Sequence, residues 1–248
     1  MMTARGKKTS VAAIFGCAFA LLIIGADAGA KEEKVPTITL PEKPAAVLPL
    51  PLPDSCHSQG LALDDNFLYL SCVDLKNKKG LVYRIARPGL ESPNAGGQLN
   101  YQKLDLTIGS QYHPSGLDLN GPCLWVAMSE YHPAPANSTI ICVDRESFQP
   151  VKEKRFPLAD HIGALAAGKN WLMAANWDAG YFYLLDYSGK LLVKGENPTG
   201  TAFQDCKYLE GDLVLCSGPA GRISGKGYTD LIRLSDLKPE SWKLNLLN

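Results

Sequence analysis

Three histidines stand at equivalent places in repeated segments of this sequence, and a carboxylate follows each of them after the same interval of seventeen residues. The histidines are His57, His113 and His161, and their carboxylates are Asp74, Glu130 and Asp178. Neutral imidazoles and carboxylates can together bind a divalent ion such as Zn, Mn, Fe or Ca. A carboxylate beside an imidazole can also orient it for general-base catalysis. These residues therefore predict a site with histidines as metal ligands and carboxylates as candidate catalytic bases.

Five further residues are predicted to contact a ligand at the same place: Gln204, Asp205, Tyr131, Trp177 and Arg222. Gln204 replaces the histidine in a fourth repeat, and Asp205 follows it. The aromatic side chains could stack on a ring, and an arginine could hold a carboxylate with two hydrogen bonds. The alternative is architectural: a His-x-x-Gly turn can fix the entry of each repeat, with the imidazole bonded to nearby backbone.

The segments that carry these residues are repeats of a strand-and-turn pattern. Short runs rich in Val, Ile, Leu, Tyr and Trp alternate with turns of Gly, Asn, Asp and Pro, which is typical of an all-β fold. The repeats begin at His57, His113, His161 and Gln204, at intervals of 56, 48 and 43 residues. Such intervals are typical of propeller blades. We expect a small β-propeller of four-stranded antiparallel blades, with four clear repeats and an extra strand near 46–52 that closes the ring or belongs to a fifth blade.

The propeller pattern brings the candidate site together. The first strand of each blade lines the central channel, and the second runs back antiparallel to it. The start of the first strand therefore lies beside the end of the second. We expect the three histidine–carboxylate pairs to meet at one mouth of the channel.

The first thirty residues read as a secretory signal peptide. Arg5, Lys7 and Lys8 precede an apolar run at 11–24, and small residues allow cleavage near residue 28 or 30. The run is shorter than the roughly 20 residues that span a bilayer. We expect a secreted or periplasmic protein with no membrane span after cleavage, a linker and closing strand at 31–53, and a propeller domain at 54–248.

Six cysteines remain after the predicted cleavage, and an even number in an exported protein favours disulfides over metal thiolates. Strand geometry selects the pairs, because cysteines at facing ends of adjacent strands can approach within about 7 Å. The predicted pairs are Cys56–Cys72, Cys123–Cys142 and Cys206–Cys216.

The charge of the chain is balanced, with 25 basic and 25 acidic residues. A nucleic-acid-binding protein would carry an excess of basic residues, so we expect no nucleic-acid partner. We expect a monomer whose partner is a small molecule or another protein.

Several motifs resemble an uncharacterised family of secreted, propeller-like proteins. They are His113, the Glu130-Tyr131-His132-Pro133 run, Val143-Asp144, the Asp160 to Gly163 run and Asn176-Trp177-Asp178. More distantly, the repeats are similar to those of gluconolactonase-type and NHL-type propellers. The resemblance to calcium-dependent lactonases implies a metal held by Glu, Asn and Asp, for which Glu130, Asn176 and Asp178 are loose analogues. The ring of histidines departs from that pattern and is more similar to metal-dependent polysaccharide lyases, which are longer chains.

Two hypotheses follow. In the first, an exported propeller binds a small ligand, a metal or a partner on the face lined by histidines. In the second, the protein is a metal-dependent hydrolase or lyase of the lactonase or polysaccharide-lyase kind. A fold by itself does not decide between them, because propellers host many functions.

Overall fold

Strands make up the regular structure of this protein in the computed structural model, which describes residues 56–87, 99–132, 136–178, 180–197, 199–219, 227–234 and 245–247. No helix occurs among these residues. They all belong to one unit, Pro41–Asn248. The predicted signal peptide at 1–30, the linker and closing strand at 31–53, and Arg222 lie outside the described residues.

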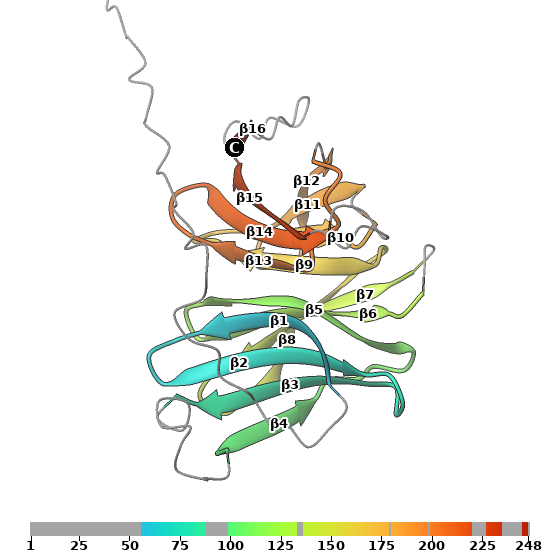
Figure 1. Cartoon of the computed structure of the whole chain (residues 1–248), viewed down its shortest axis with the longest axis vertical. Helices are drawn as coiled ribbons and strands as arrows, with labels where there is room; N and C mark the ends of the chain where they lie inside the picture. Colours follow the sequence, from blue (N-terminus) through green and yellow to red (C-terminus); the bar gives the residue numbers. More distant parts are fainter. Residues whose placement is uncertain are drawn as a thin grey trace, which may run out of the picture. The chain divides into compact units, whose positions relative to one another are not determined.

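Four antiparallel sheets of four strands form the blades of a propeller (Figure 1), which confirms the predicted fold. Blade 1 consists of β1 (His57–Leu63), β2 (Phe67–Asp74), β3 (Lys79–Ala86) and β4 (Tyr101–Asp105). Blade 2 consists of β5 (Gln111–Asn120), β6 (Cys123–Glu130), β7 (Ser138–Asp144) and β8 (Gln149–Leu158). Blade 3 consists of β9 (Ile162–Ala167), β10 (Leu172–Asn176), β11 (Tyr181–Leu185) and β12 (Leu191–Glu196). Blade 4 consists of β13 (Asp205–Tyr208), β14 (Leu213–Pro219), β15 (Gly227–Arg233) and β16 (Asn245–Leu247).

Apolar side chains between consecutive blades form the core. Tyr69 of blade 1 packs in one cluster with Leu117 and Val126 of blade 2. Blades 2 and 3 share a second cluster that contains Trp125 and Tyr183. Blades 3 and 4 share a third. Each buried aromatic or aliphatic side chain removes apolar area from water, which is the main force that holds blade against blade.

The remaining face of blade 1 is also apolar, with Leu70, Cys72 and Tyr83 buried in one cluster. Among the described residues, none from blade 4 belongs to this cluster. Leu61 and Leu63 of β1 are 44% and 54% exposed. Between blades 1 and 4, the described residues thus contain no shared apolar cluster of the kind that joins the other neighbouring blades.

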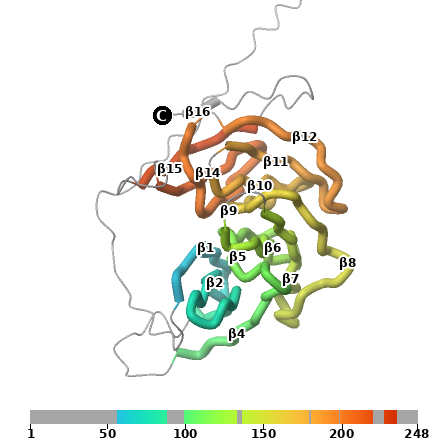
Figure 2. Tube along the Cα trace, turned by 90° about the vertical axis from the view of Figure 1, so that its right-hand side faces the viewer, coloured from blue at the N-terminus to red at the C-terminus, as the bar shows by residue number. Residues whose placement is uncertain are grey.

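The first strands of the blades lie at the centre, where β5 contacts β1, β9 and β13, and β13 also contacts β9 and β1; Figure 2 shows β5 between β1 and β9. Glycines permit this approach. A Cβ on Gly116 would lie 2.5 Å from the backbone oxygen of Gln204, and one on Gly163 would lie 2.7 Å from that of Phe203. The glycine of the repeated turn is therefore required by packing.

All three predicted disulfides are present: Cys56–Cys72, Cys123–Cys142 and Cys206–Cys216. The first joins the residue just before β1 to β2, the third joins β13 to β14, and the second joins β6 to β7. Three disulfides in one domain indicate an oxidising, extracellular environment. The described part of the chain contains no helix that could cross a lipid bilayer.

Candidate functional site

A direct hydrogen bond joins two of the predicted site histidines. His113 lies near the start of β5 and His161 just before β9, so the pair joins blade 2 to blade 3. Nδ1 of His113 is 2.8 Å from Nε2 of His161. Each residue is only 2% exposed. Burial of two titratable rings at one contact is costly unless each polar atom is satisfied, so the partners of the other ring nitrogens matter.

The partners of the two rings determine where their protons lie. Nδ1 of His161 is 3.2 Å from the backbone oxygen of His132. A carbonyl oxygen only accepts, so Nδ1 of His161 carries the proton, and the neutral ring has its lone pair on Nε2. His113 must then donate to that lone pair from Nδ1. The neutral ring of His113 is left with an unprotonated Nε2 that can accept a hydrogen bond.

Both rings are held neutral. The pKa of His113 is lowered to about 3, mainly by desolvation on burial and in addition by electrostatic repulsion from His161 and His57. Desolvation also lowers the pKa of His161, against the opposing effects of its hydrogen bond to His132 and of the Asp178 and Asp160 charges. A ring that resists protonation serves as a hydrogen-bond acceptor or metal ligand, but is a weak base near neutral pH.

Two predicted ligand-binding aromatics pack against the imidazole pair. The ring of Trp177 stacks on His161, with centroids 4.7 Å apart and an interplanar angle of 17°. The ring of Tyr131 meets His113 edge to face at 4.6 Å. A backbone hydrogen bond just beyond the ends of β9 and β10 places Trp177, since its N–H donates to the backbone oxygen of His161. Tyr131 and Trp177 are part-exposed, so they connect the buried pair with the surface.

His57, the third predicted metal ligand, is exposed, and its Nδ1 lies 2.8 Å from the side-chain nitrogen of Gln59. It borders a shallow pocket of about 430 Å³ at the end of blade 1, together with Cys56, Val73, Leu75 and Lys76. In the described parts of the chain, no three His, Cys, Asp or Glu side chains are placed so that they could hold a metal ion. The predicted set of three histidines therefore does not form one ligand cluster here.

Each predicted base lies at the same end of its blade as its histidine, but the contacts differ. Glu130 accepts hydrogen bonds from the Ser110 hydroxyl at 2.8 Å and from the backbone N–H of Asn137 at 2.9 Å. The hydrogen bond from Ser110, followed by those from Asn137, lowers the pKa of Glu130. Glu130 therefore remains ionised and holds together the loop in which it lies. Asp74 accepts from the backbone and side chain of Asn77 in the turn after β2.

Of the predicted bases, Asp178 is the one whose charge acts on the pKa of an imidazole in the pair. Its side chain is exposed, and its charge opposes the fall in the pKa of His161. A carboxylate therefore lies close enough to His161 to act on its pKa.

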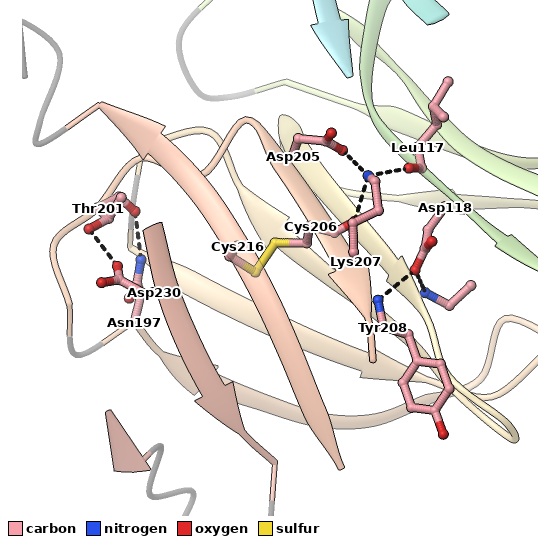
Figure 3. Close-up of a disulfide and its surroundings, with 11 residues drawn as sticks. Leu117, Asp118, Asn197, Thr201, Asp205, Cys206, Lys207, Tyr208, Cys216 and Asp230 are labelled. Atoms are coloured by element: carbon pink, nitrogen blue, oxygen red, sulfur yellow. Dashed lines mark hydrogen bonds and ion pairs between the residues drawn. A yellow bond between two sulfur atoms is a disulfide. The ribbon is translucent and has the colours of Figure 1, made fainter. Parts of the chain in front are cut away.

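Asp205, a predicted ligand residue, is bonded within the fold (Figure 3). Its Oδ1 pairs with Nζ of Lys207, which also donates to the backbone oxygen of Leu117 at 2.6 Å. Its Oδ2 accepts from the backbone N–H of Leu61 at 3.1 Å. Asp205 thus braces blade 4 against blades 1 and 2. The neighbouring Gln204 pairs through its backbone N–H with Ser217.

Two contributors to the site were not among the predicted residues. The backbone oxygen of His132 fixes the tautomer of His161, and Asp160 accepts a hydrogen bond from the backbone N–H of His161 at 2.7 Å. Asp160 also accepts from the Tyr183 hydroxyl at 2.6 Å. Its position immediately before His161 was a sequence signal that could have identified it. A backbone oxygen leaves no such signal.

Comparison with solved structures gives distant likenesses. Virginiamycin B lyase from Staphylococcus aureus has a TM-score of 0.48 at 16% identity, over 80% of this chain and 57% of that one. Glutaminyl cyclase from Myxococcus xanthus has a TM-score of 0.44 at 12% identity, over 78% and 75%. BamB from Moraxella catarrhalis has a TM-score of 0.39 at 11% identity, over 65% and 40%, so the chain spans well under two thirds of BamB and of the lyase.

No curated protein matches this sequence. Residues 38–243 match a family defined by sequence, and this range includes all four blades up to β15. That span confirms the expected membership of an uncharacterised family. The chain belongs to the family of unknown function DUF6454.

Proposed function

We propose that this protein is an exported propeller that binds a small molecule where His113 and His161 meet. The observation that carries the proposal is the buried hydrogen bond between these rings, with an acceptor nitrogen left on His113. Buried groups with strongly shifted pKa values gather at functional sites more often than elsewhere. Tyr131 and Trp177 provide the aromatic contact surface that small-molecule sites use.

A purely architectural role for the histidines accounts less well for the fold. Blade 4 begins with Gln204 and forms its four strands without a histidine at that place. His57 begins blade 1 and is exposed. A blade entry therefore does not need an imidazole, and the buried pair calls for another explanation.

Fluorescence of Trp177 offers a direct test, because its ring stacks on His161. The purified protein is titrated with a panel of amines, methyl glycosides, uronates and lactones. A saturable change in emission is expected for one class, and it is expected to disappear in Trp177→Phe and in His113→Phe, which keeps a ring but removes its nitrogens. If no compound changes the emission, or if His113→Phe binds equally well, the proposal is wrong.

A metal-dependent hydrolase or lyase is the second candidate, because an unprotonated imidazole nitrogen is what a metal ion binds. Elemental analysis of protein purified without chelator or histidine tag tests it. About one equivalent of Zn, Mn, Fe or Ca, lost in the His113→Ala, His161→Ala double variant, would support it. Turnover assays with Asp74→Asn, Glu130→Gln and Asp178→Asn would then show which carboxylate acts as base.

Export by a cleaved signal peptide is part of the proposal, and the three disulfides support an oxidising destination. Mass spectrometry of the protein recovered from the medium or periplasm is expected to show a new N-terminus near residue 28 or 30. Recovery of the full chain from the cytoplasm alone would contradict export.

A further inference from the structure

The acceptor on His113 limits which ligand can bind. Nε2 of His113 has no hydrogen-bond partner among the described residues, although the residue is only 2% exposed. The chain of bonds from the His132 oxygen through His161 leaves that nitrogen without a proton. A group that bonds to it must therefore donate a hydrogen. A carboxylate or phosphate oxygen would instead oppose the lone pair.

The charges around the pair favour the same kind of ligand. The described residues of the segments that carry the pair and its neighbours, at 108–113, 129–132, 159–162 and 176–178, include Glu130, Asp160 and Asp178 but no Lys or Arg. Glu130 is kept ionised by its hydrogen bonds, with that from Ser110 the strongest. The imidazoles are neutral. The charged side chains of these segments are therefore carboxylates, of which Glu130 also lies 3.6 Å from Nε2 of His132.

The aromatic rings of Tyr131 and Trp177 are suited to a cation as well. Tyr131 and Trp177 contact His113, with Trp177 centred 6.0 Å from it. The faces of Trp and Tyr rings attract cations within about 6 Å of the ring centre. An ammonium group between these rings could donate to Nε2 of His113 while its positive charge faces the rings and Asp178.

We propose that the ligand of this site is an organic cation, a protonated primary or secondary amine whose N–H donates to Nε2 of His113. The inference rests on the proposed ligand-binding function and names its ligand class. His161 is a positioning residue in this arrangement, since it fixes the tautomer of His113. Tyr131 and Trp177 enclose the apolar part of the ligand.

Four probes of one shape test the ligand class: benzylammonium, benzyl alcohol, benzyltrimethylammonium and benzoate, titrated by calorimetry at low salt. Benzylammonium is expected to bind at least tenfold tighter than benzyltrimethylammonium, which has charge but no N–H, and tighter than benzyl alcohol. Benzoate is expected not to bind. His113→Phe is expected to remove the preference for benzylammonium over benzyltrimethylammonium. Equal or tighter binding of benzoate would overturn the proposal.

The contribution of charge is tested by Asp178→Asn, with Asp186→Asn as its matched control. Asp186 directly follows β11, at the opposite end of that strand from Tyr181. It accepts a hydrogen bond from the Ser188 hydroxyl in a turn, and bonds to Ser188 and Lys190 lower its pKa, so it is ionised. Benzylammonium affinity is expected to fall several-fold in Asp178→Asn and to be unchanged in Asp186→Asn. Equal effects in both variants would contradict a local charge interaction.

Nuclear magnetic resonance of nitrogen-15-labelled histidine separates the two proposals. The two-bond proton–nitrogen correlations of His113 are expected to show a protonated Nδ1 and an unprotonated Nε2. A protonated Nε2 would overturn the ligand class even if a ligand binds. The expected pattern together with no binding of any probe or panel compound would overturn both the ligand class and the binding function, while the tautomer assignment would stand.

Discussion

Nδ1 of His113 lies 2.8 Å from Nε2 of His161, across 48 positions of sequence and the boundary between two blades. The same two residues occupy equivalent places in their repeats, so the repeat that builds the propeller also brings them together. Protonation of His161 at Nε2 would remove the acceptor of this bond, whereas protonation of His113 at Nε2 would place a buried charge beside it.

The imidazole pair is expected to make stability depend on pH. The pKa of His113 is about 3 in the folded protein, because burial opposes its charge, and about 6.5 when the chain unfolds. The unfolded chain therefore binds more protons between these values, and stability is lost as pH falls from about 6.5 towards about 3. One proton gives a slope of about 1.4 kcal/mol per pH unit. Urea denaturation of the protein and of His113→Gln across this range should show a shallower slope in the variant.

Other titratable groups also make stability depend on pH, so their contribution must be separated from that of His113. Asp64 and Asp105 also have a lowered pKa in the folded protein, through bonds to Arg145 and to Lys79. Their effect appears at and below about pH 4, where the carboxylates of the unfolded chain take up protons. The difference between the two proteins at pH 5–6 is therefore the decisive quantity. Identical slopes there would mean that His113 is not buried as a neutral ring.

Loss of the Asp205 brace is expected to destabilise the propeller. Asp205→Ala leaves Nζ of Lys207 without its carboxylate and the N–H of Leu61 without its acceptor. Each unsatisfied group costs about 1–3 kcal/mol, and partial exposure of the lysine reduces its share, so a loss of about 2 kcal/mol is expected. Asp105→Ala, which breaks the exposed pair with Lys79, should cost under about 1 kcal/mol. Equal losses in the two variants would rule out a brace role for Asp205.

Close packing at the centre is expected to make Gly116 intolerant of a side chain. In Gly116→Ala the new methyl group would lie 2.5 Å from the backbone oxygen of Gln204, and relief requires a shift of the backbone. We expect a loss of about 1–3 kcal/mol. Gly180→Ala is the control, because its Cβ would lie 3.7 Å from the nearest atom. Thermal unfolding of both variants measures the effect, and a tolerated Gly116→Ala would mean that the inner strands are less tightly packed than the structure has them.

Each disulfide is expected to stabilise the fold by limiting the unfolded chain. The Cys206–Cys216 bridge closes ten positions and Cys123–Cys142 closes nineteen. Loop-closure entropy then predicts a loss of about 3 kcal/mol for each pair replaced by alanine, slightly more for the longer loop. Denaturation in urea under oxidising conditions gives the values. A variant that matches the parent protein would show that its bridge adds nothing to stability.

Sequence by itself was sufficient for the propeller, its repeats and the three disulfides. Repeats that begin at intervals of 56, 48 and 43 residues indicate the blades directly, because each blade is a local unit of consecutive hairpins. The disulfides followed because each bridge joins adjacent strands of one hairpin, whose facing ends can be counted along the chain.

Only the tertiary structure decided which site residues act together. Equivalent places in the repeats gave no reason to separate His57 from His113 and His161, yet His57 is exposed and the other two are bonded and buried. The difference arises between blades, where packing on a neighbour determines burial and hence the pKa. Asp205 was likewise expected to meet a ligand, but Lys207 and the Leu61 backbone of another blade take its oxygens. Contacts between distant segments carry no local signal, so they appear only once the chain is folded.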